Sequence, residues 1–165
     1  DQTWAADMPS TGSATYNGFA QMLVSAQARN EIDEILYERS KWYLNGTSTF
    51  TADFATRDIT GRLEFDYDAA PWDAANGIWA DPGDPWWLFE LEGTISGTSF
   101  SGTVINPNLG VQNSNITSSF TGNFFGPNAT ELGGTFNYSN VNYTNDDGTT
   151  GSTYRIGTFT GCQGC

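Results

Sequence analysis

Apolar and polar residues alternate along most of this chain with a period of two, the pattern of a β-strand with one buried face. The clearest stretch covers residues 59–67, where one face is apolar and the other is charged. The alternation predicts strands over 16–24, 40–44, 47–54, 59–67, 86–95, 98–105, 116–125, 132–138 and 153–159. Only residues 26–41 place apolar residues at helical spacing, and there we expect a short helix or an irregular crossover.

Turn residues separate the predicted strands. Asn45-Gly46 is the strongest hairpin signal in the chain and predicts a tight turn between two strands. Ser96-Gly97 predicts a second hairpin, and polar or proline-rich loops are expected at 68–85, 106–115 and 140–152. Almost all neighbouring strands would therefore be antiparallel.

Consecutive antiparallel strands with one apolar face close into an up-and-down barrel or pack as a sandwich. Glycines recur within the predicted strands, which is typical of bends at barrel corners. We therefore predict an all-β fold: a single antiparallel up-and-down β-barrel of eight, or at most nine, strands with long loops. Residues 1–13 would form an extended arm pinned by Trp4 and Met8, 14–161 the β-barrel domain and 162–165 a disulfide-capped tail.

An eight-stranded barrel leaves room inside for its own side chains or for one small ligand. The predicted inward faces favour the filled interior, because they carry Phe50, Phe54, Phe65, Phe89, Phe100, Phe120, Phe124 and Phe136. We therefore expect ligand capture at the loops rather than inside the barrel.

One segment, residues 122–136, is more specific than the alternation. It reads Gly-Asn-Phe-Phe-Gly-Pro-Asn-Ala-Thr-Glu-Leu-Gly-Gly-Thr-Phe, and Pro127 presets a turn after Gly126. The segment resembles the barrel domains of transferrin-binding protein B and related Gram-negative surface lipoproteins. In that family a strand ends in an aromatic Gly-Pro motif, a short helical turn follows, and Leu-Gly-Gly opens the next strand. The matching residues are Gly122, Phe124, Phe125, Gly126, Pro127, Ala129, Glu131, Leu132, Gly133, Gly134 and Phe136.

The resemblance extends less sharply to Tyr16–Ala20, which is similar to the opening strand of small single-barrel members. It implies an exported, non-catalytic protein that binds a nutrient-related ligand or partner, of the haem, metal-carrier or host-protein class. Relatives have further domains and a lipidated N-terminal cysteine. This chain begins at Asp1 without either, so we expect a secreted or trimmed member. The alternatives are a structural subunit of a cell-surface assembly and, least favoured, a polysaccharide-acting enzyme.

Charge and composition narrow the function further. The chain has a formal net charge of −13 with 19 acidic and 6 basic residues, so nucleic acid and anionic membrane surfaces are poor partners. It has no histidine, which excludes Ser-His-Asp and Cys-His catalysis and histidine-based metal sites. No apolar run is long enough for a transmembrane helix. We expect a monomer at the surface of a Gram-negative cell, secreted from it, or in its periplasm.

The candidate binding residues are exposed aromatics. Trp72, Trp79 and Trp86 lie in or beside a proline-rich loop, where tryptophan is a typical hot spot for a partner or a flat ligand. Trp42 and Tyr43 flank the predicted Asn45-Gly46 turn and complete the candidate set. The alternative is that the loop folds back and plugs one barrel end with its own indoles; Trp87 is expected to be core.

Four further features of the sequence bear on chemistry. Cys162 and Cys165 are expected to form a small C-terminal disulfide rather than a redox pair, since they follow a strand instead of opening a helix. We predict no cofactor; haem would require ligation by a residue such as Tyr143. Carboxylates at Glu90 and Glu92 fall on an outward, solvated face. We predict no metal site, since aspartates at 81–84 and 146–147 lack calcium-loop spacing.

Overall fold

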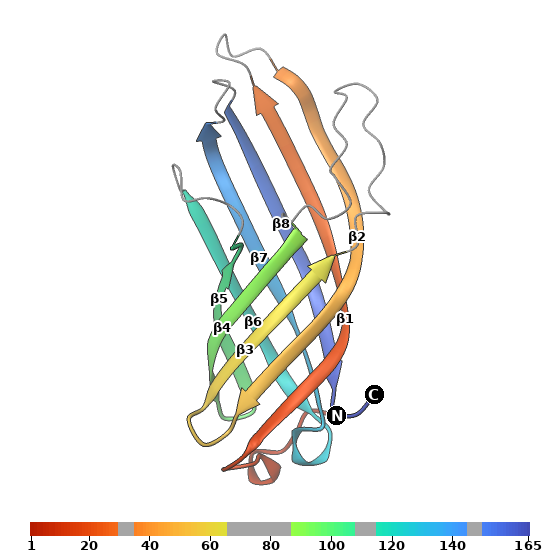
Figure 1. Ribbon diagram of the computed structural model, residues 1–165, viewed down its shortest axis with the longest axis vertical. Helices are drawn as coiled ribbons and strands as arrows, with labels where there is room; N and C mark the ends of the chain where they lie inside the picture. The colour runs from red at the N-terminus through yellow and green to blue at the C-terminus, as the bar shows by residue number, and fades with distance from the viewer. Residues whose placement is uncertain (30–34, 66–86, 108–114, 145–149) are drawn as a thin grey trace.

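Eight strands pair in sequence order, each antiparallel to the next, and the last strand pairs with the first to close a barrel (Figure 1). The computed structural model describes residues 1–29, 35–65, 87–107, 115–144 and 150–165, without the side chains of 26–29, 35–40, 42 and 142–144. The strands are β1 (Ser13–Arg29), β2 (Ile35–Asp53), β3 (Asp58–Phe65), β4 (Leu88–Ser96), β5 (Ser99–Ile105), β6 (Ile116–Phe125), β7 (Glu131–Thr144) and β8 (Thr150–Cys162). The predicted eight-stranded barrel is confirmed, and the sandwich is excluded.

The barrel wall is taller on one side than on the other. β1 and β2 have 17 and 19 residues, whereas β3 and β5 have 8 and 7. Figure 1 shows β1, β2, β6, β7 and β8 continuing beyond the point where β3, β4 and β5 end. We call the end of the barrel formed by these longer strands the far end. At the opposite end, the base, lie both chain termini and the 3-10 turns η1 (Ala5–Asp7) and η4 (Pro127–Ala129).

Two predictions between residues 26 and 46 are wrong. The predicted helix is replaced by the continuation of β1 to Arg29 and the start of β2 at Ile35, because β1 pairs with β8 as far as Arg29↔Thr150. Asn45-Gly46 is not a hairpin but lies inside β2, with Gly46 paired to Ala20 on one side and to Phe65 on the other. A Cβ on Gly46 would overlap the carbonyl oxygen of Glu64, so this glycine permits close strand contact rather than a turn.

The connection predicted at 140–152 is also shorter than expected. β7 continues to Thr144 and β8 begins at Thr150, and the two strands stay paired as far as these residues. Alternation was a weak guide here, because the polar side chains of β7 and β8 lie on both faces of the wall near the far end: Asn140 and Thr153 are buried although both are polar.

Phenylalanine fills the barrel, as predicted. All eight phenylalanines expected to point inward are buried, and Phe159 joins them. Most of their rings pack edge-on or tilted, for example Phe100 against Phe124 with centroids 5.1 Å apart, whereas Phe100 and Phe159 are stacked. Several rings lie over a glycine of the next strand: a Cβ on Gly61 would meet Phe50, on Gly122 Phe100, and on Gly157 Phe136. The mid-strand glycines therefore make space for rings as well as allowing the wall to bend.

The segment 122–136 closes the base. β6 ends at Phe125, Gly126 adopts φ 74°, η4 follows, and β7 begins at Glu131. Phe124 and Phe136 point into the core from these neighbouring strands, as expected. The N-terminal arm packs against this segment through two backbone hydrogen bonds. Thr3 N–H donates to the Phe124 carbonyl at 3.0 Å, and Gly126 N–H donates to the Asp1 carbonyl at 3.1 Å. Of the two residues expected to pin the arm, Met8 packs on the core, whereas Trp4 is 76% exposed.

The C-terminus completes the base. Cys162 and Cys165 form a disulfide, which confirms the predicted pairing. The loop it closes carries Gln163, whose backbone N–H donates to the Thr130 carbonyl at 2.9 Å. Its side-chain Nε2 donates to the Ala129 carbonyl at 2.9 Å and to the Tyr16 hydroxyl at 3.2 Å. The disulfide loop thus holds a polar side chain against η4.

Candidate functional site

The predicted aromatic site is described only in part. Trp72, Trp79 and Trp86 lie outside the described residues, and the side chain of Trp42 is not described. Tyr43 is described and is 75% exposed. It projects from the middle of β2, opposite Leu23 of β1, and not from a hairpin tip.

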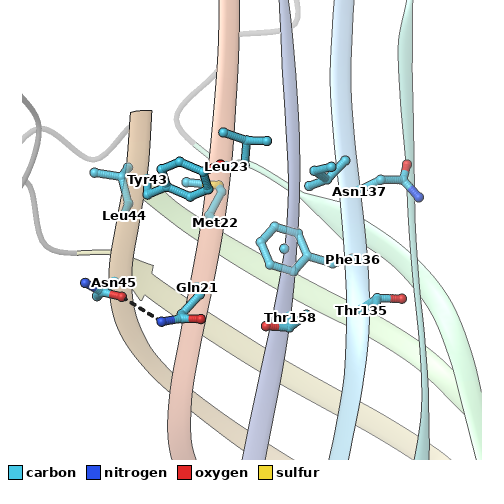
Figure 2. Close-up of a pocket in the computed structure, with 12 residues that line it drawn as sticks. Gln21, Met22, Leu23, Tyr43, Leu44, Asn45, Thr135, Phe136, Asn137 and Thr158 are labelled. Atoms are coloured by element: carbon cyan, nitrogen blue, oxygen red, sulfur yellow. Dashed lines mark hydrogen bonds between the residues drawn. The ribbon is translucent and has the colours of Figure 1, made fainter. Parts of the chain in front are cut away.

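A groove crosses the outer wall beside Tyr43, and its floor follows from the strand register. Leu44, Met22, Gly157 and Phe136 form one row across β2, β1, β8 and β7. The side chains of Leu44, Met22 and Phe136 point inward and are buried. The outer surface of this row is therefore mainly backbone, flanked by two rows of outward side chains (Figure 2). The hollow has a volume of about 700 Å³.

The two rims of this cross-strand groove differ in character. The rim towards the far end is mainly apolar and consists of Tyr43, Leu23, Ile156 and Asn137. The rim towards the base is polar and consists of Asn45, Gln21, Thr158 and Thr135. Gln21 Nε2 donates to Asn45 Oδ1 at 3.1 Å, the bond drawn in Figure 2.

None of the described residues that line the groove is charged, although the chain carries a net charge of −13. Tyr43, a candidate binding residue from the sequence, lines the groove, and the other lining residues were not predicted. Its residues come from four strands, and only the register between those strands places them side by side. The available signal was apolar residues on outward faces of the strands, such as the half-buried Leu23 and the exposed Ile156.

The far end of the interior contains a buried cation. Arg155 is 7% exposed, and its guanidinium lies 5.7 Å from the ring centroids of Trp87 and Tyr138 and 5.9 Å from that of Phe89. Rings at these distances stabilise a guanidinium by cation–π attraction. Burial raises the pKa of the Tyr138 phenol, and the charge of Arg155 lowers it by less. Trp87 packs partly buried against the core, as expected from the sequence.

The remaining chemical candidates are described only in part, since the aspartates at 81–84 and 146–147 and the side chain of Tyr143 lie outside the described residues. Glu64, Glu90 and Glu92 are exposed on the outer faces of β3 and β4, as predicted. Among the described residues no three metal-ligating side chains come together. The helical segments in the described ranges are short turns, and none is long and apolar enough to cross a membrane.

Residues 8–161 match the model of a protein family described as the C-lobe and N-lobe β-barrels of transferrin-binding protein B. The match covers almost the whole barrel, including the 122–136 segment. The chain belongs to this family. The resemblance noted for that segment is thereby confirmed.

Individual relatives agree with this assignment. Transferrin-binding protein B of Haemophilus influenzae is 25% identical over 162 aligned residues, which cover 92% of this chain and 23% of the relative. A crystal structure of transferrin-binding protein B from Haemophilus parasuis has a TM-score of 0.55 at 24% identity, covering 99% of this chain and 27% of that one. A surface lipoprotein has a TM-score of 0.52 at 20% identity, covering 97% and 64%. These two structures share the fold, and this chain spans about a quarter of the length of the transferrin-binding proteins B that it matches.

Proposed function

We propose that this barrel is a non-catalytic binding domain that captures an iron-carrying protein of the transferrin class at the surface of a Gram-negative cell. The observation that carries the proposal is membership of the transferrin-binding protein B barrel family over residues 8–161. The name of the Haemophilus influenzae relative states transferrin binding for that protein, and we extend it to this chain.

The geometry supports capture on the outer surface. The buried side chains of the described residues form one cluster rich in phenylalanine, which favours a filled interior over an internal ligand site. The base is occupied by the chain's own termini. The outer wall carries exposed side chains, among them Tyr43 and Ile156, that a protein partner can reach.

The function requires no cofactor and no catalytic residue. Haem is the cofactor alternative, and Tyr143, the ligand considered for it, lies in β7 with its side chain outside the described residues. A haemin titration of the purified chain checks this alternative. A saturable shift of the haem absorption band at one equivalent would favour haem over a cofactor-free domain.

Binding to immobilised iron-loaded transferrins from several mammals tests the main proposal. We expect saturable binding, and we expect the Trp72→Ala/Trp79→Ala double variant to weaken it at least tenfold, since aromatic hot spots contribute about 2 kcal/mol or more. Trp4→Ala is the matched control, because Trp4 is a 76% exposed tryptophan at the base. Absence of binding to every transferrin, or an equal loss in the control, would contradict the proposal. Pull-down of a bacterial surface protein instead would favour the structural-subunit alternative.

A further inference from the structure

The cross-strand groove has the composition of a site for an uncharged ligand. Its lining residues, within the part of the chain that the structure describes, are uncharged, so they offer a cation no carboxylate, and an anion would be repelled by the net charge of −13. One rim offers an exposed phenol ring and aliphatic side chains, and the other offers amides and hydroxyls. A ligand that fits both rims has an apolar face along one side and hydrogen-bonding groups along the other.

An extended peptide is a poor fit to this place. Peptides that bind sheets usually do so by pairing their backbone with a free strand edge. Here β1 is paired on both sides, with β2 and β8, and β8 is paired with β1 and β7 along the same rows. The backbone groups of the groove floor already bond to each other within the wall, so recognition depends on side chains at the rims.

We propose that the cross-strand groove binds a neutral saccharide. A pyranose ring has a C–H face that packs on an aromatic or aliphatic surface, here Tyr43 and Leu23, and hydroxyls around its edge that donate and accept hydrogen bonds. The groove spans four strands, which at about 4.8 Å per interstrand spacing gives a length of about 14 Å and accommodates a short oligosaccharide.

The hydrogen bond between Gln21 and Asn45 prepares the polar rim. It uses one donor of the Gln21 amide and the Asn45 carbonyl oxygen, and it fixes both side chains in one orientation. Within the described part of the chain, the Gln21 carbonyl oxygen then remains as an acceptor and the Asn45 NH₂ as a donor. An adjacent acceptor and donor match neighbouring hydroxyls of a sugar ring. The groove lies on the same wall that an iron carrier could reach, but the two proposals rest on different observations, and either can be wrong without the other.

The test is a ¹H–¹⁵N NMR titration of the ¹⁵N-labelled chain with neutral trisaccharides of glucose, mannose, galactose and N-acetylglucosamine, each up to about 10 mM, a range that detects weak binding. We expect at least one of them to shift backbone amides of the groove row and its rims, in β1, β2, β7 and β8, in a saturable way. Tyr43→Ala should weaken that binding about tenfold or more, and Asn45→Ala by a smaller factor.

Phe19→Ala is the matched control. Phe19 is 77% exposed, compared with 75% for Tyr43, and it lies on β1 outside the groove lining. Its loss should leave saccharide binding unchanged. The proposal is overturned if no trisaccharide shifts the groove amides, if the shifts lie elsewhere, or if Phe19→Ala weakens binding as much as Tyr43→Ala. A neutral peptide that shifts the groove amides when the saccharides do not would overturn it as well.

Discussion

The hydroxyl of Tyr16 links β1 to two parts of the base, the turn η4 and the C-terminal disulfide loop. It donates to the Ala129 carbonyl at 2.7 Å and accepts from Gln163, so the first strand is tied to η4 and to the C-terminal loop. Burial raises the pKa of Tyr16, and the hydrogen bond from Gln163 lowers it by less. The folded chain therefore keeps Tyr16 and Tyr138 neutral at a pH where the unfolded chain ionises them. Their contribution to stability is complete below about pH 10 and is lost as the pH rises through the folded pKa values.

We predict that the free energy of unfolding falls as pH increases above about 10, and falls less steeply in a Tyr16→Phe/Tyr138→Phe double variant. At pH 8, Tyr16→Phe alone should lower the free energy of unfolding by about 1 kcal/mol, because it removes hydrogen bonds in a buried place. Urea unfolding at pH 8 and at several values above 10 measures both effects. An identical pH slope in the double variant would show that these phenols do not control alkaline stability.

Single residues also show how far the sequence predicts this molecule. The inward phenylalanines were identified correctly, because strand alternation is a local property with a period of two. Asn45-Gly46 was interpreted wrongly, since the preference of that pair for turns is local, whereas the register of β2 against β1 and β3 is not. The groove was not predicted for the same reason: Leu44, Met22 and Gly157 come together only through strand pairing.

At the scale of elements, the long strands depend on contacts between glycine and aromatic rings. Gly157 of β8 faces the ring of Phe136 on β7 and the carbonyl of Gln21 on β1, and a Cβ there would overlap both. The sequence suggested bends at such glycines, but it could not show which ring lies over which glycine, since that depends on neighbouring strands. The extent of β1 and β2 was likewise underestimated, because the helical spacing of Ile32, Ile35 and Leu36 predicted a helix or an irregular crossover where the strands continue.

We predict that Gly157→Ala destabilises the barrel by about 1–3 kcal/mol, the usual effect of adding a methyl group to a filled core. Gly133→Ala is the control, because the nearest atom to a Cβ at Gly133 lies at 3.5 Å and its φ is not in the left-handed region. Thermal unfolding measures the stability of both variants, and we expect a lower unfolding temperature for Gly157→Ala than for Gly133→Ala. Equal destabilisation would mean that the lower stability comes from replacing any strand glycine, and not from a clash between the new methyl group and the Phe136 ring.

At the scale of the whole molecule, the base is where distant parts of the chain meet. The N-terminal arm, the 122–136 segment, Tyr16 and the disulfide loop are joined by hydrogen bonds that span more than one hundred residues. The family motif therefore has a structural role in this chain, closing the barrel at the end opposite the far end. The resemblance to the family identified this segment in the sequence. Its hydrogen bonds to residues near both chain ends were not predicted, because those residues are distant in the sequence.

We predict that replacing both cysteines by serine lowers the free energy of unfolding by about 2 kcal/mol, the chain-entropy value for so short a loop. Gln163 would lose its fixed position against η4, so hydrogen exchange should increase at the Gln163 N–H, which donates to the Thr130 carbonyl, and stay unchanged at the far end. Gln163→Ala with the disulfide intact separates the two contributions. Faster exchange throughout the barrel in the cysteine variant would instead indicate that the disulfide stabilises the fold globally.

Both chain ends lie at the base (Figure 1). The Asp1 carbonyl accepts a hydrogen bond from the Gly126 N–H, and Cys162 of β8 lies opposite Glu131 of β7 in the sheet. Any tether or fusion partner joined to either end would therefore leave from the same pole of the barrel. The far end and the cross-strand groove would then point away from the point of attachment. A short linker between the two ends would also permit circular permutants that keep this orientation while moving the point of attachment.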